Sequence, residues 1–241
     1  MGQVPSDDAP YLLVGNGRLS RHLQHYFDLE AIRWRLWARA MGQPLEGSLD
    51  GVRAVLLLIA DDAVEGFLTR HADPAGPPWI HCSGSLSTPL ATGVHPLMTF
   101  GNEFYDHAEY RRMAFVCDRG APSFEEFFPR LANPHFAIEP ACRPLYHALC
   151  AMAGNFTTLL WQHAFATFES RLSLPRTALY PYLERVAANL ERSASPLTGP
   201  LARGDHRTIE RHLAALEDDP FHAVYSSFVA AHRAAAREEA P

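Results

Sequence analysis

The chain contains no lysine, since all 21 of its basic residues are arginine. Lysine amines form Schiff bases with carbonyl substrates and, where their pKa is lowered, act as catalytic bases. The sequence therefore excludes both of these mechanisms. Acid–base chemistry near neutral pH has to come from another residue type, and histidine is the side chain whose ordinary pKa suits it.

The sequence also lacks a surplus of positive charge and any long apolar run. Its formal net charge is -6 at pH 7, whereas nonspecific binding to nucleic acid or to an anionic membrane needs clustered positive charge. No apolar stretch approaches the roughly 20 residues that cross a bilayer. Residues 1–10 show no basic run followed by an apolar core, so no signal peptide is expected there. We expect neither nucleic acid nor a membrane as a partner.

Cysteine is scarce and widely spaced. The four cysteines are Cys82, Cys117, Cys142 and Cys150, and no two of them form a CxxC pair. This spacing predicts neither a disulfide framework nor a zinc site. We therefore expect no metal site and a reduced, cytoplasmic location.

The first half of the chain alternates between strand and helix patterns. The composition is that of an ordinary globular protein, with 47% hydrophobic and 20% charged residues. Apolar or alternating runs predict strands at residues 11–14, 31–38, 54–60, 79–82, 93–95 and 113–117, and helical spacing predicts helices at 18–27 and 62–71. Such alternation is typical of a doubly wound, mostly parallel sheet in the α/β class. Between residues 40 and 51 there is room only for a turn or a stub of helix, so the sheet is expected to be partly uncovered there.

The pattern changes near Glu139 and Pro140. From there on, helical spacing predicts helices at residues 143–168, 176–193, 205–217 and 221–238. Residues 195–200, rich in proline and glycine, predict a firm break between helices. We therefore expect an α/β domain at residues 1–138 and an all-α domain at residues 139–241.

A glycine turn follows the first strand. Gly15, Asn16, Gly17 and Arg18 stand between a strand and a helix, where a tight backbone turn and free helix N–H groups favour a pyrophosphate. Ser20 occupies the place of the usual third glycine. The motif predicts dinucleotide binding, and a plain tight turn is the alternative.

The end of the second strand bears on the choice of cofactor. NAD-selective sites carry an acidic residue about 20 residues beyond the glycines, where it binds the ribose hydroxyls. This chain has no acid there and has Arg39 instead. Arg39 is suited to a 2′-phosphate, which favours NADP, and a solvated surface arginine is the alternative.

Polar residues also follow the later strands. Ligands of open α/β sheets bind beyond the carboxyl ends of strands, so Ser83 and Gly84 are candidates to border a nicotinamide ring and His95 to orient a substrate. Turn formation at Ser83 and a hydrogen-bonded loop role for His95 are the alternatives. For Asp61 or Asp62, a helix N-cap is favoured over a ligand contact.

The helix expected from Arg143 carries two polar interruptions. Apolar residues occur nearly all round it, which predicts a buried helix, and His147 and Asn155 stand in it about 80° apart around the axis. Buried polar groups need partners, so His147 is a candidate proton donor or acceptor and Asn155 a candidate substrate anchor. A satisfied core histidine and a helix-bonding asparagine are the alternatives.

Five segments in order carry a resemblance to a known family. They are GNGR from Gly15, WIHCSGSL from Trp79, VHPLMTF from Val94, RPLYHALCAMAGNF from Arg143 and LTGPLARGD from Leu197. Together they resemble the Rossmann-like proteins with a C-terminal helical domain of unknown function, assigned as NADP oxidoreductases in the 6-phosphogluconate dehydrogenase-like superfamily. The resemblance implies a Rossmann domain, NADP as cofactor (with NAD or a deazaflavin coenzyme as lesser options) and a homodimer formed through the helical domain. Hydroxy-acid dehydrogenases among the more distant relatives use a lysine and an asparagine on the corresponding helix, where this chain has Arg143, His147 and Asn155.

These observations lead to two hypotheses. In the first, the chain is an NADP-dependent oxidoreductase that transfers a hydride to or from a small polar carbonyl, imine or alcohol, with His147 exchanging the proton and His95 and Asn155 orienting the substrate. In the second, it is a catalytically inactive Rossmann-like nucleotide-binding or regulatory protein, as the absent lysine would allow.

Overall fold

The computed structural model of the chain describes residues 8–238. The expectation about a signal peptide therefore concerns residues that lie mostly outside the described part. Two compact units meet in sequence between Trp161 and Gln162, and each is described by itself. The domain limit expected after residue 138 stays a prediction: the last strand ends at Ile138, and the first compact unit continues through helical residues to Trp161.

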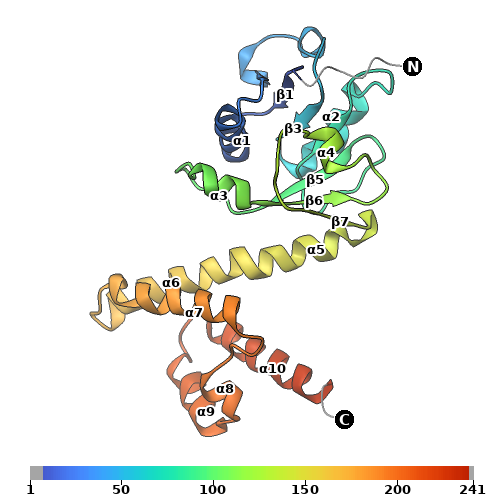
Figure 1. Ribbon diagram of the computed structural model, residues 1–241. Helices are drawn as coiled ribbons and strands as arrows, with labels where there is room; N and C mark the ends of the chain where they lie inside the picture. Colours follow the sequence, from blue (N-terminus) through green and yellow to red (C-terminus); the bar gives the residue numbers. More distant parts are fainter. Residues whose placement is uncertain (1–7, 239–241) are drawn as a thin grey trace. The chain divides into compact units, whose positions relative to one another are not determined.

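The first unit is built on one seven-stranded sheet in the order β2-β1-β3-β4-β5-β6-β7 (Figure 1). The strands are β1 (Tyr11–Val14), β2 (Trp34–Trp37), β3 (Val55–Leu57), β4 (Trp79–His81), β5 (Thr92–Leu97), β6 (Ala114–Asp118) and β7 (His135–Ile138). Neighbouring strands are parallel except for the antiparallel pair β5 and β6. The expected α/β class with a doubly wound, mostly parallel sheet is confirmed.

Both faces of the sheet are covered, because successive strand side chains point to opposite faces. Leu13 on β1 packs with residues of α1 (Arg18–Leu29), α3 (His107–Arg112) and α4 (Phe124–Phe127), whereas Leu12 and Val14 pack with residues of α2 (Asp61–His71). All four side chains of β1 are buried. This two-sided core explains why the central strands read as unbroken apolar runs.

The connection from β2 to β3 contains two short 3-10 turns, η1 (Arg39–Met41) and η2 (Glu46–Ser48), as the sequence predicted. The sheet was expected to be partly uncovered there, and on the edge strand β2 Arg35 is exposed and only Trp37 is buried. Leu45 and Val52 from this connection are 2% and 4% exposed and pack in the cluster that contains Val14 and Trp37. Apolar loop side chains thus replace the packing of a full helix.

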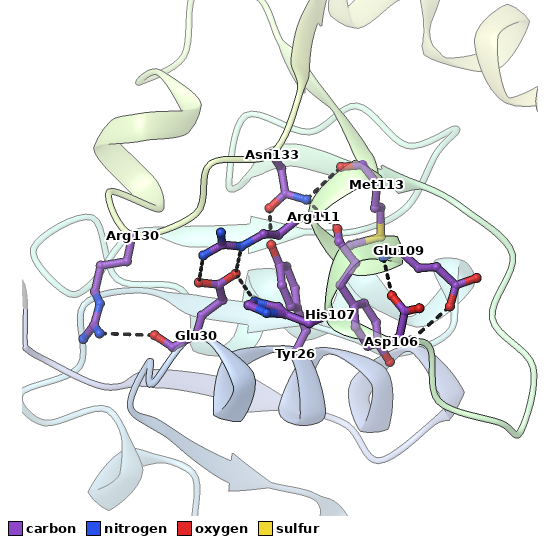
Figure 2. Close-up of polar contacts among 10 residues, drawn as sticks. Tyr26, Glu30, Asp106, His107, Glu109, Arg111, Met113, Arg130 and Asn133 are labelled. Atoms are coloured by element: carbon purple, nitrogen blue, oxygen red, sulfur yellow. Dashed lines mark hydrogen bonds and ion pairs between the residues drawn. The ribbon is translucent and has the colours of Figure 1, made fainter.

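A polar network holds the carboxyl end of α1 against α3 and the segment before β7 (Figure 2). The carboxylate of Glu30 accepts hydrogen bonds from Arg111 at 2.7 and 2.9 Å and from His107 at 2.8 Å. The bonds from Arg111 are the main reason that the pKa of Glu30 falls to about 2. Tyr26 donates to Asn133 at 2.6 Å, which in turn donates to two backbone carbonyls near the end of α3. The network fixes the helix whose other end faces the candidate site.

The helix expected at residues 143–168 is present but is not buried. It consists of α5 (Arg143–Cys150), a π-helical segment (Ala151–Phe156) and α6 (Thr157–Arg171). Its large apolar side chains are 51–65% exposed and comprise Leu145, Leu149, Met152, Phe156 and Leu159. An apolar pattern shows that a face can be buried, but it does not show that the same chain covers it. The homodimer expected from the resemblance stays a prediction.

The second unit is helical, as expected. After the end of α6 it contains η5 (Arg176–Leu179), α7 (Tyr180–Arg192), α8 (Gly199–Arg203), α9 (His206–Ala215) and α10 (His222–Glu238) (Figure 1). Asp205 caps α9, since its side chain accepts a hydrogen bond from the backbone N–H of Thr208. Within residues 8–238, no helix is long and apolar enough to cross a membrane.

A buried ion pair attaches α5 to the sheet. Arg143, the first residue of α5, has no exposed surface, and its Nε lies 2.5 Å from Oδ1 of Asp118 at the end of β6. The guanidinium also donates to the carbonyls of Ser83 and Val116. A Cβ atom at Gly93 on β5 would lie 2.3 Å from this guanidinium, so glycine leaves the space that Arg143 occupies.

We predict that Asp118→Asn lowers the free energy of unfolding by about 3–5 kcal/mol, because it leaves a buried arginine without its counter-charge. Urea denaturation followed by circular dichroism measures the change. The matched control is Glu139→Gln, which removes a pair with Arg119 whose side chains are 61% and 59% exposed. The control is expected to cost less than about 1 kcal/mol. Equal costs for the two variants would contradict the structural role given to the buried pair.

Candidate functional site

A cleft of about 2070 Å³ lies in the first unit, and every residue that lines it falls between Gly15 and Leu159. The sheet order places β1 between β2 and β3, so the strand order reverses between β1 and β3. Open α/β sheets bind ligands at the carboxyl ends of the strands at such a switch point. Of the residues expected from the sequence to form a site, all except Gly84 line the cleft: Gly15, Asn16, Gly17, Arg18, Arg39, Ser83, His95, His147 and Asn155.

The turn at Gly15 requires glycine for two reasons. Its φ is +114°, which L side chains rarely adopt, and a Cβ atom would lie 2.4 Å from the carbonyl oxygen of Leu58 at the end of β3. Ser20 has no exposed surface, and its hydroxyl donates to the Gly15 carbonyl at 2.7 Å. Ser20 therefore fastens the turn from the place where related motifs carry a third glycine.

The amino end of α1 opens onto the cleft. Gly17 is the N-cap residue, and no side chain of residues 8–238 accepts a hydrogen bond from the first N–H groups of the helix. Asn16, Gly17 and Arg18 are exposed, and nothing lies within 4 Å of where a Cβ atom of Gly17 would be. Free N–H groups, the helix dipole and one guanidinium make this end of the cleft suitable for a phosphate group.

Arg39 begins η1 directly after β2 and lines the same cleft. The side chain is exposed, and in the described part of the chain it forms neither an ion pair nor a side-chain hydrogen bond. The carboxylate of Glu46 in the following turn lies 3.7 Å from Nδ1 of His71. Arg39 thus offers a free positive charge at the end of β2, where a cofactor ribose would lie.

The expectation that Asp61 or Asp62 caps α2 is wrong. Ala60 is the N-cap residue and neither aspartate caps the helix, because both already lie in its first turn. Asp61 instead accepts hydrogen bonds from the hydroxyls of Ser83 at 2.7 Å and Ser85 at 3.4 Å. Ser83 is 6% exposed and its carbonyl accepts from Arg143. Ser83 therefore links the end of β4 both to α2 and to the buried ion pair.

His147 rests directly against Gly84. A Cβ atom at Gly84 would lie 2.4 Å from Cδ2 of the His147 ring, so only glycine lets the helix approach the end of β4 so closely. His147 follows Arg143 by one helical turn, and this spacing carries the imidazole from the buried ion pair to the cleft. Its ring nitrogens make no hydrogen bond with the protein within the described residues.

His95 and His147 form an edge-to-face pair with ring centroids 5.8 Å apart. Burial, and then the nearby His147 and Arg143, lower the pKa of His95 to about 4. Nδ1 of His95 lies 2.7 Å from the hydroxyl of Tyr146, whose pKa is raised chiefly by burial. The sequence reasoning missed Tyr146. The one sequence feature that could have drawn attention to Tyr146 is its position next to His147. Its role in the site depends on its hydrogen bond with His95, which lies 51 residues away in sequence.

The π-helical segment brings Asn155 round toward His147. In a regular α-helix, residues eight apart differ by about 80° around the axis. A π-helical turn takes more residues, because its hydrogen bonds span five residues rather than four, so each residue advances by a smaller angle. The segment Ala151–Phe156 contains Asn155 and therefore reduces the offset from His147. Both side chains line the cleft, and Asn155 is exposed rather than buried as the sequence suggested.

Residues 117–232 match the model of a family described as a domain of unknown function (DUF2520). No curated protein sequence matches the chain.

Solved structures match over almost the whole chain. A Bacteroides fragilis protein assigned as an NADP oxidoreductase is 19% identical, with 94% of this chain and 98% of that chain covered and a TM-score of 0.75. The Aspergillus terreus reductive aminase in complex with NADPH and ethyl levulinate is 17% identical (96% and 94% covered, TM-score 0.60). The 1-pyrroline-5-carboxylate reductase of Streptococcus pyogenes is 16% identical (94% and 97% covered, TM-score 0.59). These matches establish the fold and confirm the resemblance drawn from the sequence.

We predict that Gly15→Ala lowers the free energy of unfolding by about 1–3 kcal/mol, because the new side chain would need a strained positive φ and would meet the carbonyl of Leu58. Thermal or urea unfolding measures the loss. Gly17→Ala is the matched control, since its φ is -79° and its Cβ would meet open space, and we expect it to cost less than about 1 kcal/mol. If Gly17→Ala were the more damaging change, the geometry assigned to the turn would be wrong.

Proposed function

We propose that this chain is an NADP-dependent oxidoreductase that transfers a hydride to or from a small polar substrate with a carbonyl, imine or alcohol group. The observation that carries the proposal is that one cleft contains two features. The first is an uncapped helix N-terminus behind a tight glycine turn. The second is a pair of histidines, in which Nε2 of His95 and both ring nitrogens of His147 have no protein partner among the described residues. The first feature suits a phosphate and the second suits a reacting polar group.

The residues of the cleft fit the proposed cofactor. Asn16, Gly17 and Arg18, on the turn that Gly15 begins, would hold the diphosphate at the start of α1, and Arg39 the 2′-phosphate that distinguishes NADP from NAD. Ser83 would border the nicotinamide ring at the end of β4, whereas Gly84, expected to do so as well, is covered by the ring of His147. The names of the similar structures support the proposal, since one is assigned as an NADP oxidoreductase and another holds NADPH.

The chain's own contribution to the chemistry would lie at the histidine pair. NADP, when bound, supplies or accepts the hydride. His147 would give a proton to the substrate during reduction and take one during oxidation, while His95 and Asn155 orient the substrate. Arg143 cannot take the place of the relatives' lysine as a base, because its guanidinium is buried against Asp118 and stays charged.

We predict that Arg39→Gln weakens NADPH binding by about 10–100-fold, the equivalent of one or two charge-assisted hydrogen bonds, and leaves NADH binding unchanged. Titration by cofactor fluorescence measures both dissociation constants. Arg33→Gln is the matched control, because Arg33 is also exposed but precedes β2 and does not line the cleft. Absence of binding of either cofactor to the unaltered protein at about 1 mM would overturn the proposed function.

We predict that His147→Ala slows turnover by about 10²–10⁴-fold while NADPH binding is kept, because the substitution removes the proton-exchanging group and not the cofactor contacts. Turnover is measured as NADPH oxidation over a panel of aldehydes, ketones, cyclic imines and hydroxy acids. His212→Ala, outside the cleft, is the control. Full activity of His147→Ala would exclude His147 from the reaction. Tight NADPH binding without turnover across the panel would point to the inactive, nucleotide-binding alternative.

A further inference from the structure

A hydrogen bond between two cleft-lining side chains decides which nitrogen of His95 carries a proton. The hydroxyl of Tyr146 on α5 lies 2.7 Å from Nδ1 of His95 on β5. A phenol is a stronger acid than the N–H of a neutral imidazole, and an imidazole nitrogen is a good acceptor, so we infer that the hydroxyl donates and Nδ1 accepts. The ring proton of a neutral His95 is then on Nε2.

The His95 ring is neutral and its other nitrogen is free. Its lowered pKa, about 4, leaves the ring uncharged at neutral pH, because burial and the neighbouring His147 and Arg143 all disfavour a second positive charge. In the part of the chain that the structure describes, Nε2 makes no hydrogen bond with the protein. It also differs from the two ring nitrogens of His81, which are fully buried without a hydrogen-bond partner. His95 lines the cleft and so offers one N–H donor to its occupant.

Two segments that line this end of the cleft contain no acidic side chain. The lining residues of β5 and its following loop, His95 to Phe100, and those of the helical stretch from Tyr146 to Leu159 include neither aspartate nor glutamate. Asp61 and Asp62, in the first turn of α2, also line the cleft, and the carboxylate of Asp61 accepts hydrogen bonds from two serine hydroxyls. A protonated iminium nitrogen has no lone pair and cannot accept a hydrogen bond from an N–H donor. A carbonyl oxygen or a neutral imine nitrogen can accept one.

We propose that His95, held in one tautomer by Tyr146, donates its Nε2–H to a neutral acceptor atom of the substrate, such as a carbonyl oxygen, and that the substrate is therefore not bound as a protonated iminium. A carbonyl oxygen gains negative charge as its carbon accepts a hydride, and a donor that is already oriented stabilises that charge without rearrangement. His95 is the residue that touches the substrate, and Tyr146 is a positioning residue. The inference rests on the proposed function and narrows its substrate class.

The tautomer is measured on the free protein by nitrogen-15 NMR after labelling of the histidines. We expect the Nε2 of His95 at the shift of a protonated nitrogen and Nδ1 at that of an unprotonated one, across neutral pH. Tyr146→Phe should turn this single tautomer into a mixture. Tyr225→Phe is the matched control, because it removes a hydroxyl 2.8 Å from Nδ1 of His212 outside the cleft and should leave the His95 signals unchanged. An Nδ1–H tautomer or an imidazolium in the unaltered protein would overturn the assignment.

The substrate class is tested with two unreactive probes of equal shape, added to the labelled protein with NADPH. Isobutyramide presents a neutral carbonyl oxygen, and isobutyramidinium is its cationic, donor-only counterpart. We expect isobutyramide alone to shift the His95 Nε2–H signal in a saturable way, with the shift abolished in Tyr146→Phe. A shift with the amidinium alone, or with neither probe, would overturn the proposal. Failure of NADPH to bind would instead refute the proposed function. The His95 tautomer measured without cofactor would still show whether Tyr146 donates its hydrogen bond to Nδ1.

Discussion

The buried ion pair between Arg143 and Asp118 connects the sheet to the helix that carries half of the candidate site. Burying two charges costs more desolvation free energy than a surface pair, and an apolar replacement is often as stable. We infer that the pair contributes position: the guanidinium reaches the carbonyls of Ser83 and Val116 as well as Asp118, so the start of α5 can occupy only one place on the sheet. The space left by Gly93 admits this one arrangement.

The position of α5 determines the chemistry of the cleft. One helical turn beyond Arg143, the ring of His147 rests against Gly84, and Tyr146 reaches His95. The π-helical segment then turns Asn155 toward the same side. Arg143, buried against Asp118, thus acts as an anchor and not as a reactant. The groups that β5 and this helical stretch present to the cleft include two imidazoles, a phenol and an amide.

The features that local sequence determines were predictable. The strand and glycine turn at Gly15, the shortened connection after Arg39 and the helices of the second unit all follow from apolar spacing and from glycine and proline positions. Two further signals were present but unused, since Asp106 with Glu109 and Ser123 with Glu126 form capping boxes that mark α3 and α4. The strand β7 is short and exposed, so its apolar pattern is weak.

The remaining features depend on contacts between distant residues. The side chain of Asp61 binds Ser83, 22 residues later, and not its own helix, so a cap was the wrong expectation. The role of Tyr146 exists only through His95, and the exposure of Leu149 could not be read from periodicity, because an apolar stripe does not say what covers it. The π-helical turn, a rare variation inside an otherwise regular helical pattern, was likewise not predicted.

The central claim is that one cleft of the first unit holds NADP with its reactive end at the histidine pair. A crystal structure of the protein grown with excess NADPH tests it most directly. The account predicts diphosphate density at the turn from Gly15 to Arg18, and a nicotinamide ring at the end of β4, with its reactive face toward the cleft side of the histidine pair. A cofactor bound with its nicotinamide away from His147, or a cleft that stays empty at saturating NADPH, would contradict the account.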